Sequence, residues 1–135
     1  MERTLLIIKP DAVERKLIGE IIQRVERKGL EIKALKMENI TVEKAEKHYE
    51  IHKGKDFYNG LIEFITSGPV VLMVLEGKDC ISIVRHMAGS TSPVDAVPGT
   101  IRGDFSMDTL RNIVHTSDSV ETSTREIKNF FKNID

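Results

Sequence analysis

Two segments of the chain, Leu5–Ile8 and Val70–Leu75, consist entirely of apolar residues. Short apolar runs without alternation are typical of β-strands that are buried on both faces. Such strands constrain the fold strongly, because each side of the sheet that contains them has to be covered. We expect an open antiparallel sheet with helices on one face, and a partner subunit that covers the other face.

The remaining segments predict further strands and helices around these two runs. Strands are predicted over residues 3–8, 30–39, 69–75 and 112–115, and helices over 13–28, 42–51, 61–66, 79–87 and after residue 119. This βαββαβ order predicts an α+β fold with a ferredoxin-like antiparallel sheet, helices on one face, extra helices and a long active-site loop within 90–111. We expect residues 1–135 to form one domain, because the length suits a single core.

The first helix is predicted to run from Val13 to Lys28 and to end at Gly29, which is a typical C-cap. Its apolar residues recur at helical spacing and define one face, formed by Val13, Leu17, Ile21 and Val25. At its start, Asp11 and Glu14 form a pair that resembles a capping box.

Charge and composition exclude several classes of protein. The net charge is −1 and basic residues alternate with acidic ones, so nothing predicts a nucleic-acid partner. A single cysteine, Cys80, excludes an internal disulfide. We expect its side chain to be buried in the protein, and the protein to reside in a reducing compartment. The chain shows no apolar run of membrane-spanning length and no signal-peptide pattern, so we expect a cytoplasmic protein without a membrane partner.

The segment RNIVHTSDSVETSTRE places His115 between a strand-like run and a cluster of hydroxyls and carboxylates. An imidazole is a competent nucleophile near neutral pH, because its usual pKa is about 6.5. The residues Ser117, Asp118 and Ser119 are typical N-caps, and the N-terminus of a helix suits an incoming phosphate. Taken alone, this segment favours a plainer interpretation in which His115 only ends a strand, since helix caps are common and nucleophilic histidines are rare.

Two other segments favour the chemical interpretation. Lys9 follows the first apolar strand, where its ammonium could reach a phosphate. The long segment 90–111 has little net charge and carries several apolar residues, so we expect an ordered loop that presents Thr91 and Arg102. Each cation alone is as easily explained as a solvated surface charge, because the chain has 20 lysines and arginines.

The chain resembles the nucleoside diphosphate kinase family along nearly its whole length. The resemblance is carried, in order, by ERTLLIIKPDAVER, by HY at His48 and Tyr49, and by FITSGPVVLMVLEG, PGTIRGDF and NIVHTSDS. It implies an enzyme that transfers the γ-phosphoryl group of a nucleoside triphosphate to a nucleoside diphosphate in a ping-pong reaction. The phosphohistidine intermediate would form on His115.

The resemblance also implies roles for individual residues. Lys9 and Asn112 would contact the ribose and phosphate region, and Phe57 would stack on the base with broad tolerance of base and sugar. Tyr49 would lie beside the histidine. The phosphates would be held by Arg85, Thr91 and Arg102, and the imidazole would be positioned by Ser117 and Glu126.

Magnesium is expected mainly through the nucleotide phosphates, with no protein metal site and with Asp118 as a contact through water. The resemblance implies a homo-oligomer, a tetramer or a hexamer. The sequence departs from many relatives at Lys16, where they carry glycine, at Thr116, where they carry glycine or alanine, and in its short segment after Phe131.

Two alternatives stay open. A regulator on the same fold would bind nucleotide without becoming phosphorylated. His48 and His52 lie four residues apart on a predicted helix, a spacing that can bind a metal, but no third ligand is evident in the sequence. Two ordinary surface histidines are the favoured interpretation of this pair.

Overall fold

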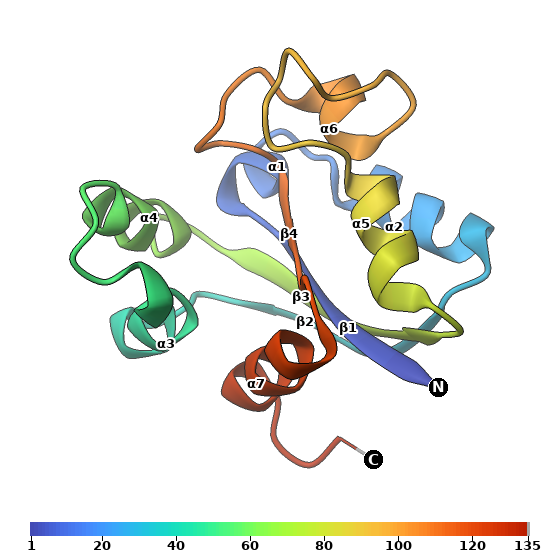
Figure 1. Cartoon of the computed structure of the whole chain (residues 1–135), viewed down its shortest axis with the longest axis horizontal. Coiled ribbons are helices and arrows are strands. Elements are labelled where there is room, and N and C mark those ends of the chain that lie inside the picture. Colours follow the sequence, from blue (N-terminus) through green and yellow to red (C-terminus); the bar gives the residue numbers. More distant parts are fainter. Residues whose placement is uncertain (135) are drawn as a thin grey trace.

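A four-stranded antiparallel sheet forms the centre of the computed structural model, which describes residues 1–134 (Figure 1). The strand order is β2-β3-β1-β4, and every neighbouring pair is antiparallel. This arrangement confirms the α+β fold and the antiparallel sheet. The strands are β1 (Glu2–Ile8), β2 (Glu31–Glu38), β3 (Val70–Gly77) and β4 (Val114–Thr116).

Helices lie on both faces of this sheet (Figure 1). One face is covered by α1 (Pro10–Glu14), α2 (Ile18–Lys28) and α5 (Cys80–Ala88), and the opposite face by α3 (Val42–His48), α4 (Tyr58–Ile65) and α7 (Val120–Phe130). A short 3₁₀ helix, η1 (Glu50–His52), follows α3, and α6 (Ile101–Phe105) lies in the long segment after α5.

The expectation that helices cover only one face is therefore wrong. Leu6 and Ile8 of β1 pack into the core beneath α2 and α5, while Leu5 and Ile7 pack into the core beneath α4 and α7. Because side chains alternate along a strand, a run of four apolar residues needs cover on both sides. The chain's own helices supply it, so burial of these strands does not require a partner subunit.

The first predicted helix is interrupted. It splits into α1 and α2, and between them Lys16 has a φ of 62°, in the left-handed region. This conformation costs an L-residue energy but not glycine, which explains why glycine suits this position. The apolar face survives the break, because Val13 and Leu17 still pack against the cluster that contains Ile21 and Val25.

The predicted capping role of Asp11 is also wrong. The N-cap of α1 is Lys9, and no side chain within residues 1–134 caps this helix end. The buried carboxylate of Asp11 instead accepts a hydrogen bond from the backbone N–H of Ile113, at 3.1 Å. Asp11 thus ties the start of α1 to the segment that precedes β4.

The long segment after α5 is ordered, as expected, and contains the short helix α6. Thr100 caps this helix by accepting a hydrogen bond from the N–H of Gly103, at 2.9 Å. Arg102 of α6 is buried and donates to the carbonyls of Gly89, Asn112 and Val114, at 2.8, 3.1 and 2.7 Å. One arginine therefore joins α6 to the end of α5 and to β4.

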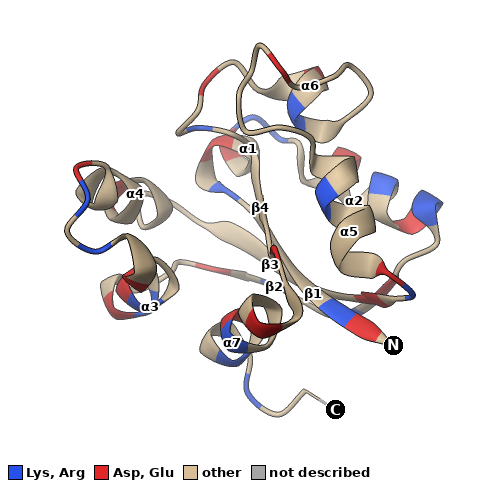
Figure 2. Cartoon of the chain, viewed as in Figure 1, with Lys and Arg blue, Asp and Glu red and all other residues tan. Residues whose placement is uncertain are grey.

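Charged residues of both signs are interspersed over the molecule (Figure 2). Within residues 1–134, none of the helices has the length and apolar character needed to span a membrane.

Replacing Lys16 by glycine should stabilise the protein. Relief of the left-handed conformation is worth about 1–2 kcal/mol, and the greater entropy of glycine in the unfolded chain offsets about half of it. We expect the free energy of unfolding in urea to rise by about 0.5–1 kcal/mol. Lys28→Gly, within the last turn of α2, is the matched control and should lower stability. Equal losses in both variants would contradict this account.

Candidate active site

His115 lies on the edge strand β4, opposite Ile7 of β1. Ile7 packs on the face covered by α3, α4 and α7, and the register places His115 on the same face. Its side chain is 21% exposed, so the ring is held by the protein and still reaches solvent.

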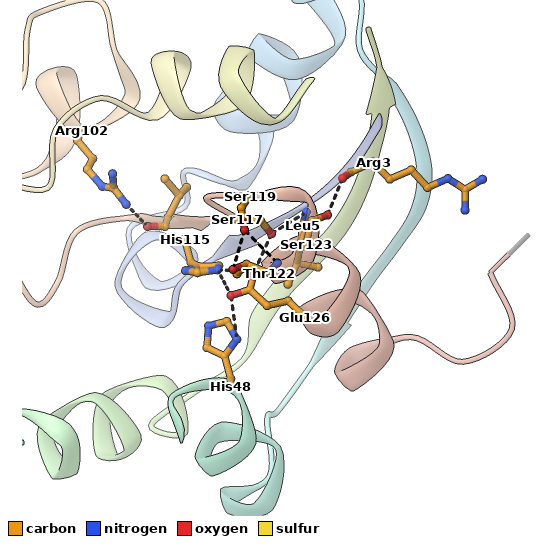
Figure 3. Close-up of polar contacts among 11 residues, drawn as sticks. Arg3, Leu5, His48, Arg102, His115, Ser117, Ser119, Thr122, Ser123 and Glu126 are labelled. Carbon is orange, nitrogen blue, oxygen red and sulfur yellow. Dashed lines mark hydrogen bonds and ion pairs between the residues drawn. The ribbon is translucent and has the colours of Figure 1, made fainter. Parts of the chain in front are cut away.

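The imidazole contacts the buried carboxylate of Glu126, which comes from α7 (Figure 3). Nε2 of His115 lies 3.0 Å from each carboxylate oxygen. Ser117 donates its hydroxyl proton to Glu126 Oε1 at 2.6 Å and accepts a hydrogen bond from the N–H of Leu5 at 3.3 Å. The structure thus brings together three of the predicted site residues, His115, Ser117 and Glu126.

These contacts determine which ring nitrogen is free. An ionised carboxylate can only accept, so the proton of a neutral His115 belongs on Nε2 and the lone pair on Nδ1. Burial acts to raise the pKa of Glu126, but the hydrogen bond and charge of His115, together with Ser117, outweigh burial and lower that pKa. Glu126 is therefore a stable acceptor, and Nδ1 is the nitrogen available as a nucleophile.

His48 is a further member of this site that sequence reasoning did not include. Its ring meets the His115 ring edge-on, with centroids 4.5 Å apart, and its side chain is only 1% exposed. Burial, reinforced by the charge of His115, lowers the pKa of His48 to about 3, so its ring is neutral. Within residues 1–134, neither ring nitrogen of His48 has a hydrogen-bond partner. The HY dipeptide was the sequence signal that could have placed this residue at the site.

Tyr49 lies one ring further away from His115. Its buried ring contacts His48 at a centroid distance of 4.6 Å. Burial and the nearby Glu126 raise its pKa, so the hydroxyl stays protonated. The structure thus places Tyr49 near His115 through His48.

The pair of histidines spaced for a metal does not converge. His52 lies near Phe57, with ring centroids 5.3 Å apart, whereas His48 turns inward. Among the described residues, the cluster suited to holding a metal instead joins His48, His115 and Glu126, whose ligand atoms all lie within 4.8 Å of one another.

A cavity of about 380 Å³ opens beside His115. Its lining contains three cationic side chains and no carboxylate, which makes it a site for an anion. The lining residues are Lys9, Arg85, Gly89, Ser90, Thr91, Arg102, Asn112, His115 and Thr116. A larger hollow of about 960 Å³ lies between the start of β1 and α7, but it contains neither His115 nor these cations.

Lys9 is buried at the end of β1, and its Nζ donates to Oδ1 of Asn112 at 2.8 Å. Burial, followed by repulsion from Arg102, lowers the pKa of Lys9 to about 8. Burial and the charge of Arg85 likewise lower the pKa of Arg102 to about 10. Among the described residues, carbonyls bind three of the five N–H groups of Arg102, so two remain for a ligand.

The backbone before β4 is tightly turned. Ile113 has a φ of 77°, and the N–H of Val114 donates to the carbonyl of Asn112 at 2.8 Å. A β-branched residue in this region is strained, and such strain is common at functional sites. Asp11 binds the N–H of Ile113 and Lys9 donates its own N–H to the Ile113 carbonyl at 2.9 Å, so the strained turn is held on both sides.

The two remaining predicted residues are exposed. Thr91 is exposed and lines the anion cavity. Phe57 is 52% exposed just before α4 and is not part of the cavity lining. A ligand that fills the cavity and reaches Phe57 has to extend over the surface between them.

Comparison with known proteins identifies what this chain is similar to. A family model described as nucleoside diphosphate kinase matches residues 2–135. A nucleoside diphosphate kinase of Methanocaldococcus jannaschii is 60% identical over 131 residues, which cover 97% of this chain and 94% of the relative.

Solved structures agree. Nucleoside diphosphate kinase from Encephalitozoon cuniculi, in its apo form, superposes with a TM-score of 0.96 at 45% identity, covering 98% of this chain and 90% of that one. The enzyme from Halobacterium salinarum in complex with CDP gives a TM-score of 0.95 at 47% identity, covering 98% of this chain and 88% of that one.

Anion binding should draw a proton onto Lys9. With a pKa of about 8, Lys9 is half neutral at pH 8, and an anion beside it raises that pKa. Binding of ADP at pH 8 should therefore take up as much as about half a proton, and much less at pH 6, where Lys9 is already charged. Calorimetry in two buffers of different ionisation enthalpy measures this uptake. Lys9→Met should abolish it, and equal uptake by that variant would contradict the assignment.

Proposed function

The chain belongs to the nucleoside diphosphate kinase family, and we propose that it carries out the family's phosphoryl transfer through a phosphohistidine at His115. The family assignment makes the protein an enzyme, a kinase that acts on nucleotides. One observation carries the proposal: His115 Nε2 is bound to Glu126, and the ring lies at the wall of a cavity with three cations.

In the first half-reaction, the Nδ1 lone pair of His115 attacks the γ-phosphorus of a nucleoside triphosphate. The N–P bond forms as the bond from the γ-phosphorus to the bridging oxygen breaks, and a nucleoside diphosphate leaves with that electron pair. The ring becomes positively charged, and Glu126, held by Ser117, stabilises it through Nε2–H. In the second half-reaction, a different nucleoside diphosphate attacks the phosphohistidine, and the steps reverse.

Cations of the cavity stabilise the transferred group. Phosphoryl transfer depends mainly on alignment and on charges placed around the phosphoryl oxygens. Arg85, Thr91 and the two free N–H groups of Arg102 hold phosphates, while Lys9 and Asn112, already hydrogen-bonded to each other, bind the ribose and phosphate region. Tyr49 packs against the ring of His48, which in turn packs against the ring of His115.

Magnesium fits this site as a companion of the nucleotide. Mg²⁺ prefers oxygen ligands, and the lining of the anion cavity contains no carboxylate to form a protein cage. When bound to the phosphates, the ion would neutralise charge on the leaving diphosphate. Asp118, just before α7, carries a carboxylate whose pKa is lowered most by a hydrogen bond from Thr122, and we infer that it contacts the hydrated ion through water.

Exposure of Phe57 supports base stacking without selection among bases. Every base has a π-face, so an exposed aromatic ring binds all of them with little discrimination. The relative from Halobacterium salinarum was solved with CDP. We infer that this enzyme accepts both purine and pyrimidine nucleotides, with ribose or deoxyribose.

We also infer that the enzyme is a cytoplasmic homo-oligomer, a tetramer or a hexamer, in which residues 1–135 form one catalytic domain. Supporting self-association, Leu35 and Met37 are 50% and 57% exposed on β2, at the edge of the sheet. The buried, free thiol of Cys80 suits a reducing compartment.

The direct test is a labelling experiment with His115→Ala as the matched variant. Wild-type protein incubated with γ-labelled ATP and Mg²⁺, then separated from nucleotide, should carry label that acid removes and base does not. Added GDP should collect this label as GTP. The variant should bind ATP and carry no label.

A protein that binds ATP but never becomes labelled would contradict the proposal. That result would favour the alternative function, a nucleotide-binding regulator on the same fold.

Replacing Phe57 by alanine should weaken binding of all nucleotides alike. Loss of base stacking costs about 1–3 kcal/mol, so KM should rise by about 5- to 150-fold for adenine, guanine and cytosine substrates. Phe57→Tyr keeps the ring and should retain the wild-type KM. An effect confined to one base would show that Phe57 reads identity instead of providing a general stacking surface.

A further inference from the structure

Three side chains from three separate elements converge on one point: His48 from α3, His115 from β4 and Glu126 from α7 (Figure 3). His115 Nε2 lies 3.0 Å from Glu126 Oε1, and His48 Nδ1 lies 3.6 Å from Glu126 Oε2. All three side chains offer a ligand atom within 4.8 Å of the others.

These donors and spacings match a transition-metal site. Two imidazoles and one carboxylate are ligands that Zn²⁺ accepts, at about 2.0–2.2 Å from the metal. Ligands of a tetrahedral ion at that distance lie about 3.3–3.5 Å apart. The two separations from Glu126, 3.0 and 3.6 Å, bracket this value, and the two imidazoles offer nitrogens within 4.8 Å of each other, so the three side chains have to draw together only slightly around an ion.

His48 gives an independent reason to look for a ligand. Its side chain is 1% exposed, and neither ring nitrogen has a hydrogen-bond partner among the described residues. The 3.6 Å separation from Glu126 is too long for a hydrogen bond. Buried polar atoms are almost always paired, so an unpaired imidazole aimed at a carboxylate and a second histidine is unusual.

We propose that His48, His115 and Glu126 bind a divalent transition-metal ion of the Zn²⁺ type, and that this ion inhibits phosphoryl transfer. The metal site stands on the geometry alone, whereas the inhibition rests on the proposed function of His115.

Inhibition follows from the tautomer of His115. A metal ion on Nε2 uses the lone pair of that nitrogen, so the proton of the neutral ring moves from Nε2 to Nδ1. No proton is gained or lost overall. Nδ1 then carries hydrogen and has no lone pair with which to attack phosphorus. Mg²⁺ does not compete for this site, because it prefers oxygen ligands in an octahedral arrangement.

The experiment uses the whole chain, freed of metal with a chelator that is then removed. Zn²⁺ binding is measured by calorimetry, and Co²⁺ serves as a spectroscopic probe of tetrahedral coordination. His48→Phe keeps a ring packed against Tyr49 and Phe130 and removes both ligand nitrogens. His52→Ala is the matched control, because it removes a partly exposed histidine four residues away.

Wild-type protein should bind one Zn²⁺, and His48→Phe should weaken binding by at least about 100-fold, since even residues behind a metal ligand change affinity by about 10–100-fold. His52→Ala should bind as tightly as wild type. Zn²⁺ should also block transfer of label from ATP to GDP in the wild type, with recovery when chelator is added.

Equal Zn²⁺ affinity in the wild type and His48→Phe would overturn the metal site, as would a failure of the wild type to bind Zn²⁺. If His48-dependent Zn²⁺ binding is found in a protein that ATP never labels, the metal site stands and the proposed kinase mechanism fails. Normal transfer that Zn²⁺ does not affect, in protein shown to hold the ion, would overturn the inhibition.

Discussion

The hydrogen bond between His115 Nε2 and the buried carboxylate of Glu126 is the interaction on which the site depends. A carboxylate that loses its partners inside a protein is strongly destabilising, so Ser117 and His115 are needed for Glu126 to stay ionised there. The helix that carries Glu126, α7, is attached to β1, because the hydroxyl of Ser123 donates a hydrogen bond to the carbonyl of Arg3 at 2.5 Å. Packing of α7 against β1 therefore decides which nitrogen of His115 is free to react.

The sheet brings this pair next to the anion cavity. β1 lies between β3 and β4, so the residue that follows it, Lys9, emerges beside Asn112 and the start of β4. The strained turn at Ile113 lies in this short segment, and the buried guanidinium of Arg102 binds the carbonyls on either side of it, those of Asn112 and Val114. The cations and His115 thus line the same cavity.

The strands, most helices and several chemically important residues could be predicted from the sequence, because apolar periodicity is local. Contacts between distant residues could not. The contact of Glu126 with His115 spans eleven residues and an intervening turn, so it was expected only from the resemblance to the family. His48 was misjudged because burial depends on tertiary packing, and α6 was missed because five residues show no periodicity. The same fully apolar strands require cover on both faces. The cover of the second face had been attributed to a partner subunit, whereas the chain's own helices supply it.

We infer that Glu126 holds the proton of His115 on Nε2 and leaves Nδ1 as the nucleophile. Nitrogen-15 NMR of protein labelled in its histidines tests this most directly, by reporting the protonated nitrogen of His115 before reaction and the phosphorylated nitrogen afterwards. We expect the Nε2–H tautomer and a phosphoryl group on Nδ1. A proton on Nδ1 in the metal-free protein, or a phosphoryl group on Nε2, would contradict it.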